Sequence, residues 1–178
     1  MSGIFISYRR KDSSGETGRL YDRLKKVFPA KGLFVDVDAI DPGVDFPEVL
    51  SKKLRFCDIM LVIIGPNWIS NHDGSGRHRL DSEKDFVRME ITTALSRNIR
   101  VVPILLNNTP MPEIGELPDD LKPLARRQAL ELRHSRFDDD AEYIVKRCKA
   151  MIVGNNQGEP SSVQVRASTV FSLTLMIS

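Results

Sequence analysis

Short apolar runs alternate with longer amphipathic segments along most of this chain. The runs lack the regular polar positions of a half-exposed strand, so each is expected to be a strand covered on both faces. The segments between them carry apolar residues three and four positions apart, which is the spacing of a helix. The predicted strands are residues 4–7, 33–37, 59–64, 100–106 and, more weakly, 128–132, and the predicted helices are residues 18–28, 46–56, 82–98 and 138–152.

Strands that alternate with helices indicate βαβ units with right-handed crossovers. Five such strands predict an α/β fold, a flavodoxin-like doubly wound parallel sheet with strand order 2-1-3-4-5 and helices on both faces. In sheets of this kind, ligands bind at the carboxyl ends of the strands, beside the point where the strand order reverses. The segments 7–10, 37–45 and 65–68 are therefore expected on one rim of the sheet.

The composition fits one globular domain followed by a tail. Of the 178 residues, 41% are hydrophobic and 28% are charged, which is an ordinary balance for a globular protein. We expect the domain to cover residues 1–152. In the tail, 153–178, the stretch 155–162 resembles a linker and 170–177 is apolar but too short to span a bilayer. The tail could be disordered, a docking strand or the start of a truncated segment.

Charge and cysteine usage narrow the possible partners. The net charge is +2, from 26 basic and 24 acidic residues, which gives no reason to expect nucleic acid or a membrane as a partner. No secretory signal precedes the strand at Ile4, so we expect a cytoplasmic protein. Cys57 and Cys148 are expected to be buried, reduced thiols. The three histidines lack metal-ligand spacing, so no metal site is predicted.

Groups able to contact a nucleotide follow directly on the first strand. Residues 7–10 supply a hydroxyl, a phenol ring and two guanidinium groups. Much later, Phe86 and Glu90 stand four positions apart, which places them near each other on a helix. Glu90 is expected at the margin of the buried stripe, half shielded and beside the ring. Glu83 shares nearly the same face and is a competing candidate, and an aromatic–acid pair at this spacing is by itself more often a surface feature.

Several motifs, taken in order, resemble those of Toll/interleukin-1 receptor (TIR) domains over about residues 1–150. Residues 5–8 (FISY) resemble the first box of the family, and residues 38–46, with Pro-Gly at the tip, resemble its second box, the BB loop. Phe86 and Glu90 are similar to the Trp-xxx-Glu pattern of bacterial and plant-type TIR domains that cleave NAD, with phenylalanine in place of tryptophan. Residues 65–68 and 101–105 also resemble the prokaryotic branch.

The resemblance implies that NAD is a substrate, with no prosthetic group, and that Glu90 is the catalytic residue acting on the nicotinamide-side ribose. A carboxylate there would stabilise the positive charge that grows on the ribose as the glycosidic bond breaks. The candidate NAD contacts are Ser7, Tyr8, Arg9, Arg10, Asp38, Phe46, Trp68 and Phe86, of which Trp68 is equally well interpreted as a core residue. The candidate BB-loop contacts to other TIR domains are Ile40, Asp41, Pro42, Gly43, Val44 and Asp45.

Three functions remain open at this point. The first is an NAD hydrolase or cyclase in prokaryotic defence signalling, which forms ADP-ribose or a cyclic isomer and is activated by head-to-tail self-association. The second is a non-catalytic module that only binds other TIR domains. The third is an enzyme like the nucleoside deoxyribosyltransferases, which the Pro-Gly loop and the segment around Trp68 disfavour. A phosphoacceptor receiver domain would need an aspartate at the end of the third strand, where this chain has Gly65.

Overall fold

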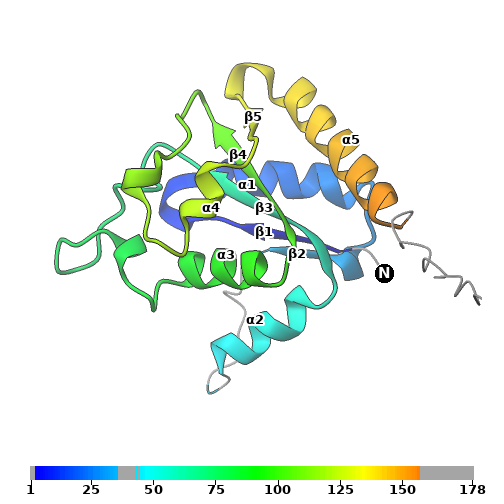
Figure 1. Ribbon diagram of the computed structural model, residues 1–178. Helices are drawn as coiled ribbons and strands as arrows, with labels where there is room; N and C mark the ends of the chain where they lie inside the picture. The colour runs from blue at the N-terminus through cyan, green and yellow to red at the C-terminus, as the bar shows by residue number, and fades with distance from the viewer. Residues whose placement is uncertain (1–2, 36–42, 44, 157–178) are drawn as a thin grey trace, which may run out of the picture.

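The computed structural model describes residues 3–35, 43 and 45–156. Its centre is a sheet in which every neighbouring pair of strands runs parallel, in the order β2-β1-β3-β4-β5 (Figure 1). This confirms the predicted fold class and strand order. The strands are β1 (Gly3–Ser7), β2 (Leu33–Val35), β3 (Cys57–Ile64), β4 (Arg100–Leu106) and β5 (Leu130–Leu132).

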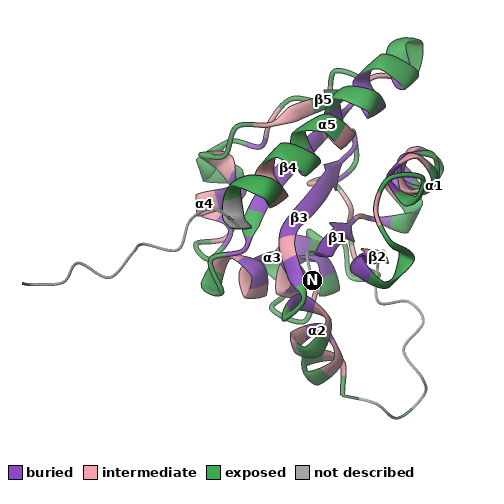
Figure 2. Ribbon diagram, turned by 90° about the vertical axis from the view of Figure 1, so that its right-hand side faces the viewer, coloured by how far each residue is buried: buried purple, intermediate pink, exposed green. Residues whose placement is uncertain are grey.

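Helices cover both faces of the sheet. One face carries α1 (Arg10–Lys25) and α5 (Phe137–Asn156), and the other carries α2 (Phe46–Leu54), α3 (Phe86–Ser96) and the short α4 (Lys122–Ala125). Successive residues of β3 point to opposite faces, so Ile59, Leu61 and Ile63 pack towards α1 and α5. Met60, Val62 and Ile64 pack towards the other layer. The strands β1, β3 and β4 are therefore buried on both sides over most of their length (Figure 2), which explains their largely apolar sequences, whereas the edge strands β2 and β5 are only partly buried.

Gly65, which directly follows β3, lies close to the side chain of Asp12 in the first turn of α1. A Cβ atom on Gly65 would lie 2.4 Å from Asp12 Oδ2, so only glycine fits at this position without a shift of the carboxylate. The other oxygen of the same carboxylate, Oδ1, accepts a hydrogen bond from the backbone N–H of Asn67 at 2.9 Å. The first turn of α1 is thereby fixed over the end of β3.

Two helices begin at positions that differ from the prediction. Helix α1 starts at Arg10 and not at residue 18, because Gly15 and Gly18 weaken the helical signal of the sequence. Burial of Thr17 and of later residues stabilises the helix in spite of these glycines, and a kink at Ser13 (φ −146°, ψ 20°) interrupts its start. Helix α3 starts at Phe86 and not at residue 82, since Asp85 is its N-cap.

Helix α5 extends to Asn156, past the predicted end at residue 152. Cys57 and Cys148 are both free and buried, as the sequence predicts, and they lie on opposite faces of the sheet. Burial raises the pKa of each thiol to about 12. None of the helices in the described part of the chain has the length and apolar character needed to cross a bilayer.

Candidate functional site

A buried hydrogen bond joins the end of β1 to α3. The hydroxyl of Ser7 donates to Glu90 Oε2 at 2.6 Å, and both residues have no exposed surface. Glu90 shares the buried side of α3 with Val87, Ile91 and Ala94. The expectation of a half-shielded Glu90 is therefore wrong. The carboxyl group is fully buried because a hydroxyl on the central sheet supplies a polar partner inside the protein.

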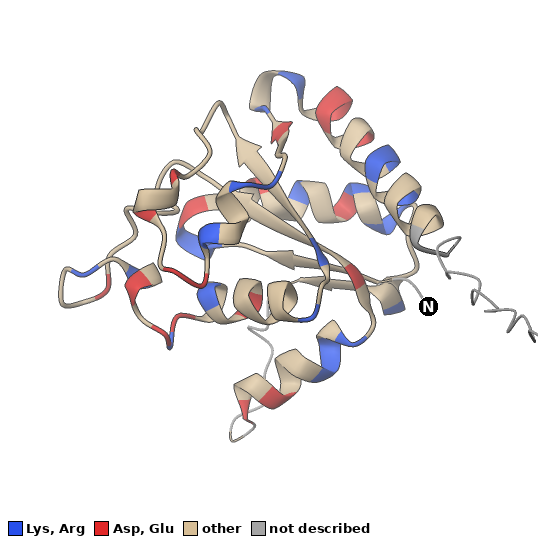
Figure 3. Ribbon diagram, in the orientation of Figure 1, with Lys and Arg blue, Asp and Glu red and all other residues tan. Residues whose placement is uncertain are grey.

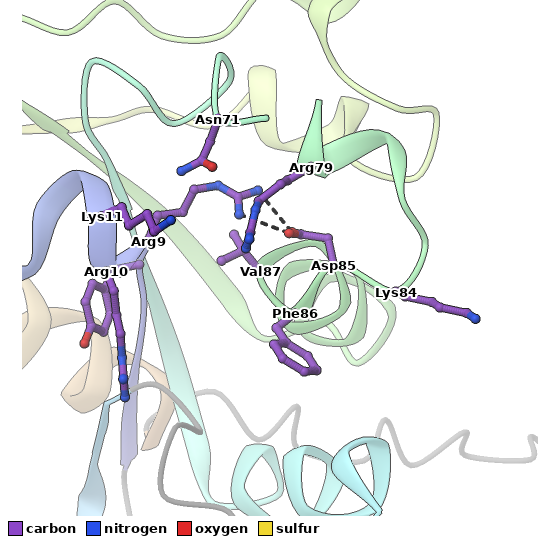
Figure 4. Close-up of a pocket in the computed structure, with 10 residues that line it drawn as sticks. Arg9, Arg10, Lys11, Asn71, Arg79, Lys84, Asp85, Phe86 and Val87 are labelled. Atoms are coloured by element: carbon purple, nitrogen blue, oxygen red, sulfur yellow. Dashed lines mark hydrogen bonds and ion pairs between the residues drawn. The ribbon is translucent and has the colours of Figure 1, made fainter. Parts of the chain in front are cut away.

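A cavity of about 340 Å³ lies beside this contact, between the start of α1 and the start of α3 (Figure 4). Its lining includes Tyr8, which follows Ser7 directly, and Val87, which lies one helical turn before Glu90. Five of the lining residues are basic and one is acidic, and basic residues gather where α1 begins (Figure 3). The cavity therefore favours an anionic ligand. Its full lining is Tyr8, Arg9, Arg10, Lys11, Asn71, Arg79, Lys84, Asp85, Phe86 and Val87.

The side chain of Arg9 is directed into the protein. Its two terminal nitrogens donate to the two carboxylate oxygens of Asp85, each at 3.0 Å, and its Nε donates to the carbonyl of Trp68 at 3.2 Å. The side chains of Arg9 and Asp85 are only 5% and 6% exposed. In this arrangement Arg9 is bound to a carboxylate of the protein, so its predicted contact with a pyrophosphate has no support here.

Two phenylalanines from different helices meet near the cavity. The rings of Phe46, the first residue of α2, and Phe86, the first residue of α3, have centroids 4.4 Å apart. Phe86 is 56% exposed, so its ring still offers surface to a ligand. Tyr8 is half-buried and Arg10 is exposed, and both line the cavity. The structure thus brings Tyr8, Arg10 and Phe86 together around one hollow.

The structure does not support Trp68 as an NAD contact or Glu83 as an alternative to Glu90. Trp68 is fully buried in the core, with the Arg9 guanidinium 6.0 Å from its ring centroid, so it presents no open face to a base. Glu83 is exposed and lies before α3 begins, so it does not share a helical face with Glu90. Glu83 is therefore no competitor for the role of Glu90.

The BB loop lies mostly outside the described residues. Asp38, Ile40, Asp41, Pro42 and Val44 belong to that part of the chain, so their roles stay predictions. Gly43 has φ +89°, a conformation that glycine adopts far more readily than other residues. Gly43 and Asp45 are both exposed.

Sequence reasoning missed Asp85, which the structure places at the centre of the site. Its carboxylate accepts a hydrogen bond from the backbone N–H of Arg88 at 3.0 Å, which caps α3, and it also binds Arg9. An aspartate directly before a helix is a recognisable N-cap signal, but the predicted start at residue 82 concealed it. Asn71 and Arg79 were missed too, and no signal in the sequence links their loop to the cavity. Among the side chains that the structure describes, no cluster of His, Cys, Asp or Glu could hold a metal ion.

A sequence model of the TIR domain family matches residues 4–145. The chain belongs to the TIR domain family. Among curated proteins, this TIR domain is 27% identical over 140 residues to a Drosophila melanogaster protein named NAD(+) hydrolase sarm1, and 26% identical over 145 residues to Danio rerio NAD(+) hydrolase SARM1. The alignments cover 76% and 80% of this chain but only 9% and 19% of the relatives.

Solved structures give the same fold. The TIR domains of the activated Roq1 resistosome, which recognises the pathogen effector XopQ, superpose with a TM-score of 0.53 at 16% identity, over 86% of this chain and 98% of that one. A metazoan TIR-STING receptor from C. gigas gives a TM-score of 0.52 at 18% identity, over 82% of this chain and 38% of that one. At these identities the likeness shows the fold alone, whereas the names of the two curated relatives support the resemblance to NAD-cleaving TIR domains.

Proposed function

We propose that this TIR domain cleaves the bond between nicotinamide and ribose in NAD, with Glu90 as the catalytic residue. The observation that carries the proposal is the buried carboxyl group of Glu90, held by Ser7 beside a basic cavity. The NAD hydrolase names of two relatives support the same reaction. The family match leaves the nucleoside deoxyribosyltransferase alternative without support.

The main requirement of the reaction is a negative charge close to the nicotinamide-side ribose. The bond between ribose C1′ and the nicotinamide nitrogen breaks, and its electron pair stays on that nitrogen, so nicotinamide leaves as a neutral molecule without a general acid. Glu90 stabilises the positive charge that develops on the ribose. Water then adds to C1′ and loses a proton to solvent, which gives ADP-ribose, or an adenine nitrogen adds instead, which gives a cyclic isomer.

The cavity provides for the rest of the dinucleotide. Arg10, Lys11 and Arg79 attract the pyrophosphate, since guanidinium and ammonium groups bind phosphate oxygens through charge-assisted hydrogen bonds. Phe86 offers a stacking surface. It stands where the family's Trp-xxx-Glu pattern has tryptophan, and it lacks the indole N–H of tryptophan but keeps an aromatic face. Because Glu90 has no exposed surface, the side chains around it move before a ribose reaches it.

Release of nicotinamide tests the proposal. We expect the purified domain to release nicotinamide from NAD, detected by mass spectrometry, and Glu90→Gln to lose about 10²-fold or more of the rate. Glu83→Gln is the matched control, because Glu83 is an exposed carboxylate just outside the same helix. Equal turnover by the wild type and Glu90→Gln would remove Glu90 from the mechanism. No turnover in any assembly state would favour the non-catalytic binding module.

Self-association is proposed as the activating step. Residues 36–45 contain four aspartates and no lysine or arginine. A hollow of about 260 Å³ is lined by three exposed arginines, Arg100, Arg127 and Arg147, together with Tyr143 and apolar strand residues. Arg100 begins β4, so this hollow lies at the end of the parallel sheet opposite to that of Ser7. The sequence predicts that the acidic segment lies at the same end as Ser7, and opposite charges on opposite ends favour a head-to-tail contact, which can extend into a filament.

The self-association proposal has its own experiment. We expect nicotinamide release per molecule to rise with protein concentration, and Arg127→Glu combined with Arg147→Glu to abolish both this rise and the larger species seen by light scattering. Lys146→Glu combined with Lys149→Glu, which makes the same total charge change on α5 outside the hollow, is the control. A specific activity that does not depend on protein concentration contradicts the proposal. A setting in prokaryotic defence rests on the motif resemblance, and loss of cellular NAD upon phage infection would test it.

A further inference from the structure

Arg9 connects three separate segments of the fold. It follows Tyr8 at the end of β1, its Nε reaches the carbonyl of Trp68 beyond β3, and its two terminal nitrogens reach Asp85 at the start of α3. In Figure 4 the Arg9 side chain crosses the cavity towards Asp85, whereas the neighbouring Lys84 points away from both. The link between Arg9 and Asp85 is thus directed across the site, from the sheet to the helix that carries Glu90.

We propose that Arg9 and Asp85 are positioning residues, which set the height and rotation of α3 against β1 and so hold Glu90 in contact with Ser7. This inference rests on the proposed function for its catalytic consequence, although its structural part stands separately. Neither Arg9 nor Asp85 is proposed to bind the substrate. They act through the Ser7–Glu90 pair.

The spacing of the two contacts carries the argument. Ser7 and Arg9 are two residues apart in extended chain, which is roughly 6.6 Å. Asp85 and Glu90 are five residues apart at the start of a helix, a rise of roughly 7.5 Å. The chain segments from β1 and α3 therefore run side by side over nearly equal lengths and are joined at both ends, by the Arg9–Asp85 ion pair and the Ser7–Glu90 hydrogen bond. A helix attached to a strand at two points can neither slide nor turn without breaking one of them.

The geometry of the ion pair suits this role. Both nitrogens of a planar guanidinium bind both oxygens of one carboxylate, so the pair fixes orientation as well as distance. The carboxylate is also the N-cap of α3 through the Arg88 backbone, and the Arg88 side chain donates to the carbonyls of Leu80 and Asp81. A buried ion pair is a poorer source of stability than apolar packing, so we assign this pair the role of fixing one arrangement of α3 against β1.

The test separates positioning from capping. Asp85→Ser keeps a good N-cap but removes the partner of Arg9. We expect its kcat for nicotinamide release to fall about tenfold or more, with KM within about threefold of the wild type, because a misplaced catalytic group slows the reaction more than it weakens binding. The double variant Arg9→Gln/Asp85→Ser leaves no lone buried charge, and the same loss of kcat is expected there if the single variant does not fold. Asp140→Ser, which breaks a similar bidentate pair with Arg133 between β5 and α5, is the control and should keep its kcat.

Crystal structures of the variants give a result that does not depend on activity. We expect the distance from Ser7 Oγ to Glu90 Oε2 to lengthen from 2.6 Å to beyond hydrogen-bonding range in the Asp85→Ser and double variants. An unchanged distance overturns the inference, and so does a wild-type kcat in Asp85→Ser. If the wild-type domain releases no nicotinamide while this distance lengthens, the proposed reaction fails and the positioning of α3 by Arg9 and Asp85 stands.

Discussion

Ser7 Oγ and Glu90 Oε2 lie 2.6 Å apart although 83 residues separate them in the chain. The contact joins the last residue of β1 to the middle of α3, a helix in the layer that covers one face of the sheet. Both side chains are fully buried, so each supplies the polar partner that the other needs inside the protein. Stability and proposed catalysis therefore depend on the same pair.

Replacing Ser7 by alanine should show both effects at once. Glu90 would lose the hydroxyl that donates to Oε2, and we expect the free energy of unfolding to fall by about 1–3 kcal/mol, the usual cost of removing a buried partner. The rate of nicotinamide release should fall together with it. Urea unfolding and a nicotinamide assay measure the two effects. Ser14→Ala, at an exposed serine of α1, is the control, and a Ser7→Ala protein as stable as this control would contradict the prediction.

Gly65 should not tolerate alanine. The added Cβ would lie 2.4 Å from Asp12 Oδ2, so the carboxylate must move and its hydrogen bond to Asn67 is strained. We expect a loss of about 1–3 kcal/mol in the free energy of unfolding, as for other overpacked sites.

Gly115→Ala is the matched control for Gly65→Ala, because nothing lies within 4 Å of a Cβ at that position. Combining Gly65→Ala with Asp12→Ala removes the clash and should recover part of the loss. Equal stability of the Gly65→Ala and Gly115→Ala proteins in thermal unfolding would show that the carboxylate moves aside at no cost.

Asp140 should make the fold sensitive to acid. Its side-chain hydrogen bonds with Arg133 hold the pKa of the Asp140 carboxyl below its usual range, and the Arg133 backbone N–H adds to this effect. A carboxyl group with a lowered folded-state pKa stabilises the fold above its unfolded value of about 3.9, and that stabilisation is lost as the pH falls through the folded-state pKa.

The measurement is the free energy of unfolding in urea between pH 2 and 6. We expect Asp140→Asn to be less stable than the wild type by about 1–3 kcal/mol near neutral pH, and the two proteins to converge as the pH falls below the folded-state pKa. Asp139→Asn serves for comparison, since Asp139 is exposed and its contact with Arg136 is longer, at 3.4 Å. Parallel pH profiles for wild type and Asp140→Asn would contradict the assignment.

The two cysteines should be inert in the native protein. With a pKa of about 12 for both Cys57 and Cys148, roughly 10⁻⁴ of each thiol is thiolate at pH 8, and the thiolate is the reactive form. We expect Ellman's reagent to label neither thiol in native protein at pH 8 and both in denaturant. Rapid labelling of native protein would show that one of the two layers opens frequently.

The fold was predictable because β1, β3 and β4 are largely buried on both faces and therefore read as apolar runs. The short edge strands β2 and β5 are only partly buried, and β5 gave the weakest signal. The start of α1 was not predictable, because Gly15 and Gly18 lower the helix propensity of a segment that burial of Thr17 and Leu20 stabilises as a helix. Local patterns are enough to find strands in the middle of a protein, whereas helix ends depend on contacts made elsewhere in the chain.

The site was predictable only in part. Motif resemblance singled out Glu90 and Ser7, which the structure brings into contact, but the pattern of α3 alone placed Glu90 at the edge of the buried stripe. The partner of Arg9 could not be read from the sequence, because Asp85 lies 76 residues away and competes with every other acid on that rim. Trp68 likewise depends on packing that no local pattern reveals.

For the proposed reaction, full burial of Glu90 means that part of the molecule must rearrange before a sugar reaches the carboxyl group. Strand β1 is paired on both sides and packs against the layer formed by α1 and α5, so we expect both to stay in place. We therefore expect the displacement in α2 and α3, which meet through the Phe46 and Phe86 rings. A dinucleotide or an adjoining subunit that separates these two rings would therefore expose the carboxyl group of Glu90.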